Sequence, residues 1–297
     1  MKKIGSLLIF LTLAVLSHAQ QLPLYSQYML NDYVMNPAIA GSNPYYECKS
    51  NNRYQWVGIT DAPRTYIMSI NGQIKGRPVG IGGSVFTDIT GPTRRTGINL
   101  SYAYHLKLND EVKLGLGLSA GVLQYAVDAS KINTHDINDI AISTSLQSTT
   151  VPDFGFGTYL YSDKFYFGVA APQIYPSRLD FFDYKSKSKI VTHIYATGGY
   201  KYKINDAFVL QPTALIKFVS PAPIQIDLGA RMIYQEKVWL GAGYRTKDAL
   251  SALVGYTYQN NITIGFSYDF TTTNVRKYSS GTSELYFAIK FYNPDKK

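Results

Sequence analysis

Two-residue alternation of apolar and small or polar side chains runs through most of this chain. In the ranges 98–106, 112–122 and 262–270, each apolar residue is followed by a small or polar one. Side chains on a β-strand point to opposite faces in turn, so the pattern predicts strands with one apolar face. Beyond residue 19 no apolar stretch approaches the roughly 18 residues of a spanning helix.

The connections between these strands alternate in length. Fourteen strands are predicted, near 50–57, 65–74, 79–86, 94–107, 111–125, 153–161, 165–171, 191–203, 207–218, 223–234, 237–245, 249–258, 262–270 and 284–292. Counted in this order, the even-numbered strands are followed by tight turns at 109–110, 162–163, 205–206, 235–236 and 260–261. The longest connections, 126–152, 172–190 and 271–283, follow odd-numbered strands, with a short exception near 246–248.

Short turns alternating with longer loops on an even number of antiparallel strands are typical of an outer-membrane β-barrel. Lipid offers no hydrogen bonds, so a sheet in a membrane must close on itself. The sequence therefore predicts an all-β, up-and-down transmembrane barrel of about 14 antiparallel strands with an N-terminal segment outside the barrel wall. A soluble β-sandwich or lipocalin-like barrel is the alternative, but only 16% of residues are charged, below the about 25% of a typical soluble domain.

Tyrosines gather before the tight turns, where they are expected to form an aromatic girdle at the periplasmic interface. The residues in question are Tyr102, Tyr104, Tyr159, Tyr161, Tyr200, Tyr202, Tyr234, Tyr256 and Tyr258.

The first 19 residues have the pattern of a secretory signal peptide. Lys2 and Lys3 precede an apolar run from Ile4 to Leu16, and Ser17-His18-Ala19 resembles a cleavage site. We therefore expect three segments: a signal peptide (1–19), a plug-like or docking segment (20–44) and the barrel (45–297). The mature protein is expected in the cell outer membrane, after cleavage near Ala19, as a multi-pass protein in contact with lipid and lipopolysaccharide.

The motifs that usually indicate enzymes lack the required context here. Gly117–Gly121 matches a nucleophile elbow, but Ser119 lies inside an alternating strand rather than at a strand-to-helix turn. The glycines here are better explained as relief of crowding on the inner face of the barrel. Cys48 has no histidine nearby in sequence, and the histidines lack zinc spacing. We expect no catalytic residue, no cofactor and no metal.

The formal net charge of +9 does not indicate a nucleic-acid partner. Lysines and arginines are scattered, and no basic run beyond the signal peptide is longer than Arg94-Arg95.

A series of short motifs runs in order along the chain, from about residue 22 to residue 292. The motifs are Tyr25-Ser26-Gln27-Tyr28-Met29, Asn31, Asn36-Pro37-Ala38, Gly41, Arg53, Gln55-Trp56, Ala62-Pro63, Phe86-x-Asp88, Gly91-Pro92, Leu100–Tyr104, Gly199-Tyr200, Gln211-Pro212, Trp239-x-Gly241, Tyr244-Arg245, Gly265–Phe270, Ser280-Gly281 and Glu284. In this order they resemble the PorP/SprF family of type IX secretion system membrane proteins. Where that family tends to read His-Glu near the last strand, this chain has Ser283-Glu284.

The resemblance implies a non-enzymatic outer-membrane barrel that works with other type IX secretion components. It would assist the export or surface anchoring of a secreted surface protein, such as a large adhesin used in gliding motility and attachment. A passive porin-like channel and a lipid-modifying enzyme are the alternatives, but the sequence has no cluster of Ser, His and acid for the latter.

Two regions are candidates for partner binding: the motif-rich N-terminal segment and the long loops. The alternative interpretation of the N-terminal segment is a simple structural plug. The candidate residues are Ser26, Gln27, Tyr28, Asn31, Asn36, Pro37, Gln55, Trp56, Tyr175, Phe181, Phe182 and Tyr184.

Overall fold

The computed structural model describes residues 25–132, 146–179 and 189–291, which form one antiparallel sheet. Its strands are β1 (Tyr46–Tyr54), β2 (Arg64–Gln73), β3 (Val79–Thr90), β4 (Thr93–Lys107), β5 (Lys113–Asp128), β6 (Leu146–Tyr161), β7 (Phe165–Ala171), β8 (Ile194–Tyr200), β9 (Tyr202–Lys203), β10 (Phe208–Phe218), β11 (Gln225–Tyr234), β12 (Val238–Arg245), β13 (Ala249–Tyr258), β14 (Ile262–Thr271) and β15 (Thr282–Phe291). Short 3₁₀ turns are η2 (Asp32–Val34), η3 (Pro37–Ile39), η4 (Ala129–Lys131) and η5 (Asn274–Lys277).

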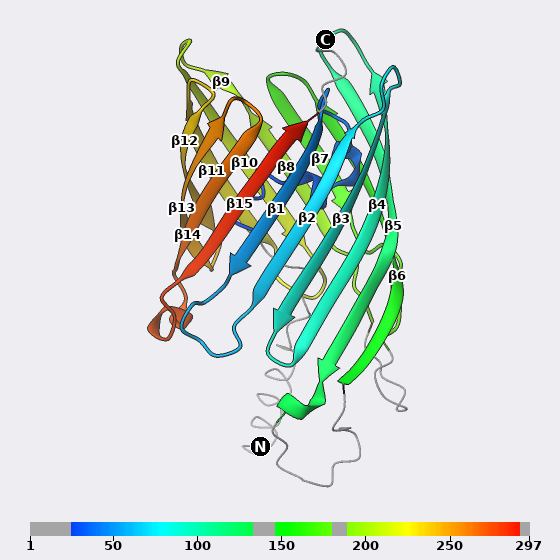
Figure 1. Ribbon diagram of the computed structural model, residues 1–297, viewed down its shortest axis with the longest axis vertical. Coiled ribbons are helices and arrows are strands. Elements are labelled where there is room, and N and C mark those ends of the chain that lie inside the picture. The colour runs from blue at the N-terminus through cyan, green and yellow to red at the C-terminus, as the bar shows by residue number, and fades with distance from the viewer. Residues whose placement is uncertain (1–24, 133–145, 180–188, 292–297) are drawn as a thin grey trace, which may run out of the picture.

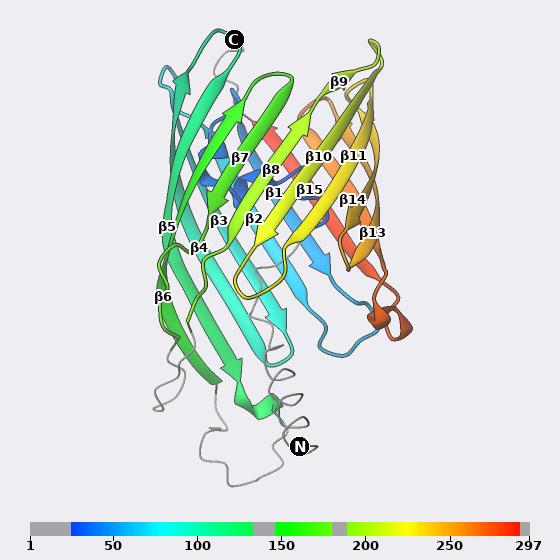
Figure 2. The same cartoon turned by 180° about the vertical axis from the view of Figure 1, so that it is seen from behind.

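The sheet closes on itself between its first and last strands. β1 pairs with β2 on one side and with β15 on the other, from Tyr46↔Phe291 to Tyr54↔Ser283. β8 and β9 both pair with β10 and are two parts of one span, interrupted at Lys201. The result is a closed barrel of fourteen spans, as predicted (Figures 1 and 2).

The two ends of the barrel differ in their connections. The turn end, at the top of Figure 1, carries 74–78, 108–112, 162–164, 204–207, 235–237 and 259–261. The loop end carries 55–63, 91–92, 219–224, 246–248 and 272–281, together with the described parts of the β5–β6 and β7–β8 connections, 129–132, 172–179 and 189–193. The β3–β4 connection is only Gly91-Pro92, so the expected alternation of short and long links fails there as well as at 246–248.

The outer face of the wall is apolar. On β4 and β5, Ile98, Leu100, Leu118 and Val122 are exposed, whereas Ala103 and His105 face inward and are buried. No helix within the described residues is both long and apolar enough to cross a membrane. The outward side chains therefore form the surface suited to lipid contact.

Most of the predicted aromatic girdle is present at the turn end. Tyr159 and Tyr161 are exceptions, because the alternation along β6 turns both of them inward. Tyr159 is buried against other aromatic rings, and the Tyr161 hydroxyl lies 3.0 Å from Nδ1 of His105. The exposed members are Tyr102, Tyr104, Tyr200, Tyr202, Tyr234, Tyr256 and Tyr258.

Residues 25–45, here called the lumen segment, lie inside the barrel (dark blue in Figure 1). Tyr28, Met29 and Met35 pack with wall residues that include Leu215 and Trp239. A second apolar cluster contains Tyr33 and Ala38–Ala40, together with wall residues Ala103 and Tyr159. The N-terminal chain thus packs as an apolar core against the inner wall at these two places.

Glycines of the wall let the lumen segment approach closely. A Cβ atom at Gly117 would collide with the backbone of Pro37 and Ala38, and one at Gly80 would collide with the backbone of Ala40. The interpretation of Gly117 as relief of crowding on the inner face is confirmed, and the crowding comes from the lumen segment.

Candidate functional site

A connected group of six charged side chains lies on the inner wall near the loop end. Each sits on an inward-facing strand position, because alternation directs every second residue into the lumen. Three are cationic and three are anionic, so the set is balanced in charge. They are Arg53 on β1, Lys217 on β10, Asp227 on β11, Arg245 on β12, Asp269 on β14 and Glu284 on β15.

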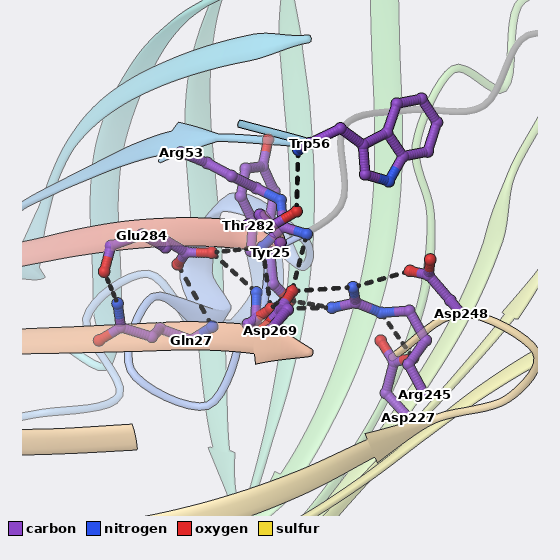
Figure 3. Close-up of polar contacts among 12 residues, drawn as sticks. Tyr25, Gln27, Arg53, Trp56, Asp227, Arg245, Asp248, Asp269, Thr282 and Glu284 are labelled. Carbon is purple, nitrogen blue, oxygen red and sulfur yellow. Dashed lines mark hydrogen bonds and ion pairs between the residues drawn. The ribbon is translucent and has the colours of Figure 1, made fainter. Parts of the chain in front are cut away.

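The hydroxyl of Ser26 lies at the centre of this set. It donates to Oδ2 of Asp269 at 2.6 Å and accepts hydrogen bonds from Arg53 at 2.9 Å and from Arg245 at 3.2 Å. Arg53 also pairs with Asp269 at 2.9 Å and with Glu284 at 3.2 Å. We call Ser26, Arg53, Arg245, Asp269 and Glu284 the clamp; Figure 3 shows its polar contacts.

Glu284 holds the backbone of the lumen segment. Its two carboxylate oxygens accept from the N–H groups of Ser26 at 2.8 Å and of Gln27 at 3.2 Å. The Gln27 amide in turn donates to the Glu284 carbonyl at 3.0 Å. A charged acceptor on two successive N–H groups fixes position as well as charge.

Arg245 links the clamp to the neighbouring strands. Its guanidinium contacts Asp227 at 3.1 Å, Asp248 at 3.1 Å and the Tyr25 carbonyl at 3.2 Å. Lys217 lies 2.7 Å from the other oxygen of Asp227. Arg53, Asp269 and Glu284 are at most 2% exposed. Buried charges of this kind stabilise a structure only when each has its partner.

A second set of hydrogen bonds lies deeper in the lumen. The Asn31 amide donates to Asn51 at 2.8 Å and accepts from the Ser69 hydroxyl at 3.0 Å. Asn51 then donates to Glu284 at 2.9 Å, which joins this set to the clamp.

The remaining N-terminal candidates also contact the wall or shape the segment. The Tyr28 hydroxyl lies 3.1 Å from the Thr213 hydroxyl. The Asn36 side chain accepts from the Ala38 N–H at 3.0 Å and donates to the Thr158 carbonyl at 2.9 Å, so it caps η3, which begins at Pro37.

The structure therefore separates the predicted partner-binding residues into two groups. Ser26, Gln27, Tyr28, Asn31, Asn36 and Pro37 are buried in the lumen, where a partner could reach them only after the segment moved. The other predicted residues either lie at the loop end or fall outside the residues that the structure describes. Gln55 and Trp56 are partly exposed in the β1–β2 connection, Tyr175 is 56% exposed in the β7–β8 connection, and Phe181, Phe182 and Tyr184 lie outside the described residues.

The β1–β2 connection is held in place by its neighbour. The Trp56 N–H donates to the Thr282 hydroxyl at 3.1 Å, and Val57 exchanges backbone hydrogen bonds with Ser280 and Gly281. The exposed side of Trp56 is thus presented from an ordered loop (Figure 3).

Sequence reasoning did not assign a site role to the charged members of the clamp. The family motifs include Arg53, Arg245, Asp269 and Glu284 but give them no role, and Asp227 and Lys217 belong to no motif. A charged residue on the inward face of a strand, near its loop end, is the sequence signal that identifies such a site.

The arrangement is suited to anchoring the lumen segment rather than to catalysis. Its arginines and carboxylates are bonded to one another and to the lumen segment. Within the described ranges, no group of three His, Cys, Asp or Glu side chains is placed to hold a metal ion.

Comparison with known proteins gives one family match. The family model described as "Type IX secretion system membrane protein PorP/SprF" matches residues 17–289. No curated protein matches the chain.

Solved outer-membrane barrels resemble the fold. The Pseudomonas putida toluene transporter TodX has a TM-score of 0.51 at 7% identity, covering 88% of this chain and 94% of its own. The CymD monoaromatic hydrocarbon channel has a TM-score of 0.48 at 11% identity, covering 92% and 94%. A Pseudomonas aeruginosa FadL homologue has a TM-score of 0.45 at 14% identity, covering 86% and 91%. At these identities the likeness is one of fold alone.

Proposed function

This chain belongs to the PorP/SprF family of type IX secretion system membrane proteins, and from that premise we propose that it assists the export or surface anchoring of a partner protein such as an adhesin. In this role the barrel is a sealed platform rather than a conduit. It works with other type IX secretion components in the outer membrane, contributes to attachment or gliding motility, and carries no catalytic chemistry.

The clamp is the observation that carries this proposal. It fixes the start of the lumen segment to strands β1, β12, β14 and β15. Farther along the segment, Ala38 and Ala40 are fully buried, Ala38 against β5 and Ala40 against β3. A lumen filled in this way favours a structural plug over a passive porin-like channel. We assign residues 20–44 to the plug and 45–297 to the barrel, after removal of a signal peptide near Ala19.

A plugged barrel leaves its loop end as the surface for a partner outside the cell, since outer loops of such barrels are the longer ones. Trp56 and Tyr175 present aromatic surface there, and aromatic side chains are enriched where proteins bind each other. We place partner contacts at this end, at Gln55, Trp56 and Tyr175. The other residues predicted from the sequence to contact a partner, Phe181, Phe182 and Tyr184, lie outside the described residues.

Co-purification tests the proposal. The tagged barrel, solubilised in detergent from its native cells, should retain an adhesin or a secretion component that mass spectrometry identifies. A Trp56→Ala variant should lose most of this material. The matched control is Tyr202→Ala, which removes an exposed aromatic ring at the turn end.

Recovery of the barrel without an adhesin or secretion component would contradict the proposed role. Equal recovery by the two variants, with a partner present, would contradict the placement of the contacts around Trp56.

A further inference from the structure

A cavity lies at the turn end of the lumen, away from the clamp. Its volume is about 450 Å³, and Met29, Leu30 and Asp32 of the lumen segment contribute to its lining. Side chains of the β6–β7 and β11–β12 turns, including Lys164 and Glu236, also line it. We call this cavity the vestibule.

The vestibule has more cationic than anionic side chains. Five cations and three acids line it, namely Lys49, Lys164, Lys201, Arg231 and Lys290 with Asp32, Glu47 and Glu236. Two of the acids are already engaged, because Lys49 lies 2.6 Å from Glu47 and 3.8 Å from Asp32. The remaining positive charge therefore exceeds what the nearby acids neutralise.

Arg231 is the buried member of this excess. It is 8% exposed, and its guanidinium donates to the Gln211 amide oxygen at 2.6 Å and lies 5.3 Å from the centre of the Trp239 ring. Its Nε has no hydrogen-bond partner, and no carboxylate of the described chain lies within ion-pair distance. Buried guanidinium groups normally have a counter-ion.

We propose that the vestibule binds a carboxylate group, which pairs with Arg231. A guanidinium presents its N–H groups as a fork that matches the two oxygens of a carboxylate. Lys164, Lys201 and Lys290 attract an anion toward the opening. Glu236 repels polyanions, and so do Asp32 and Glu47, which share Lys49 as their ion-pair partner. A singly charged group therefore fits better than a phosphate.

The C-terminal carboxylate of an extended peptide and a small free acid both carry this chemistry. The cavity has room for several residues of a peptide beside the rings of Trp239, Tyr166 and Tyr286. This inference does not depend on the proposed export role, because it concerns the opposite end of the lumen.

Trp239 provides an internal reporter for the test, since it packs against Arg231. The chain has two tryptophans, so Trp56→Phe leaves Trp239 as the only fluorophore of its kind. The probes are N-acetyl-Gly-Ala-Val-Leu with a free carboxylate, its C-terminal amide, acetate and inorganic phosphate. The free acid should change Trp239 emission saturably, and the amide should bind at least about tenfold more weakly.

Two variants in the Trp56→Phe background assign the binding to Arg231. Arg231→Gln should abolish the response, whereas Arg94→Gln, which removes an exposed arginine on β4, should leave it unchanged. A shift in SDS-gel mobility between unheated and heated samples checks that each variant is folded. The comparison of acid with amide needs no change at Arg231 and stands if Arg231→Gln does not fold.

The outcomes separate the sources. Tighter binding of the peptide acid than of acetate assigns the site to peptide termini, and equal binding assigns it to small acids. The proposal is overturned by equal binding of acid and amide, by tighter binding of phosphate than of acetate, by an unchanged response in folded Arg231→Gln, or by no saturable response up to about 10 mM.

Discussion

The hydroxyl of Ser26 lies 2.6 Å from Oδ2 of Asp269, although 243 positions separate the two residues in sequence. The same hydroxyl accepts from Arg53 and Arg245. These contacts form only when the lumen segment is inside and β1, β12 and β14 are assembled around it. Closure of the barrel and filling of its lumen are therefore coupled at this point.

Removing the Ser26 hydroxyl should destabilise the protein. Ser26→Ala removes the hydroxyl that donates to Asp269 and takes one acceptor from each of Arg53 and Arg245. We therefore expect a loss of about 1–3 kcal/mol in the free energy of unfolding. Urea unfolding in detergent measures this change. Ser148→Ala, at an exposed position of β6, is the control, and equal stability of the two variants would show that the hydroxyl has no such role.

Neutralising Asp269 should have a larger effect. Asp269→Asn leaves two buried guanidinium groups facing an amide, and breaking a buried pair costs about 3–5 kcal/mol. The melting temperature, followed by heat-modified gel mobility, should fall clearly. Asp206→Asn disrupts an ion pair in which Asp206 is 99% exposed and should change little. Matching melting temperatures would argue against the clamp.

An added methyl group at Gly117 should displace the lumen segment. Gly117→Ala places a Cβ against the backbone of Ala38, whereas the nearest atom to a Cβ at Gly198 is 3.7 Å away. Oxidation of the buried Met29 and Met35 by peroxide, read by mass spectrometry, reports displacement. Both methionines should become reactive in Gly117→Ala and stay protected in Gly198→Ala. Protection in both variants would contradict this close packing.

A charged side chain placed on the outer face, midway between the two ends of the barrel, should destabilise the protein. Leu100 is 69% exposed near the middle of β4, so Leu100→Lys should cost about 2–4 kcal/mol in a bilayer. Leu108→Lys, in the β4–β5 turn, should cost no more than about 1 kcal/mol. Unfolding in lipid vesicles compares them. Equal, small effects would indicate that water rather than lipid contacts the wall.

The spanning strands were largely predictable because each one alternates between two environments. The clearest misses lie at the starts of two strands. β1 begins at Tyr46 rather than near residue 50, and β6 begins at Leu146 rather than near 153. Charged Glu47 and Lys49 occupy the inward positions at the start of β1, and polar Ser148 and Thr150 occupy outward positions at the start of β6, so both stretches resemble loops in sequence.

The clamp could not be predicted in the same way, because its contacts are long-range. Arg53 and Asp269 are 216 positions apart, and a two-residue period indicates which face a side chain occupies but not what it meets across the lumen. Tyr159 shows the related error on β6. Its place before a turn suggested the girdle, whereas its position in the alternation faces the lumen.

Planar-bilayer conductance of the intact mature protein tests most directly whether the N-terminal chain closes the barrel. We expect a silent membrane with the unmodified protein and open-channel steps when Gly117→Ala displaces the lumen segment. A steady ohmic current through the unmodified protein would contradict the account and favour a passive channel.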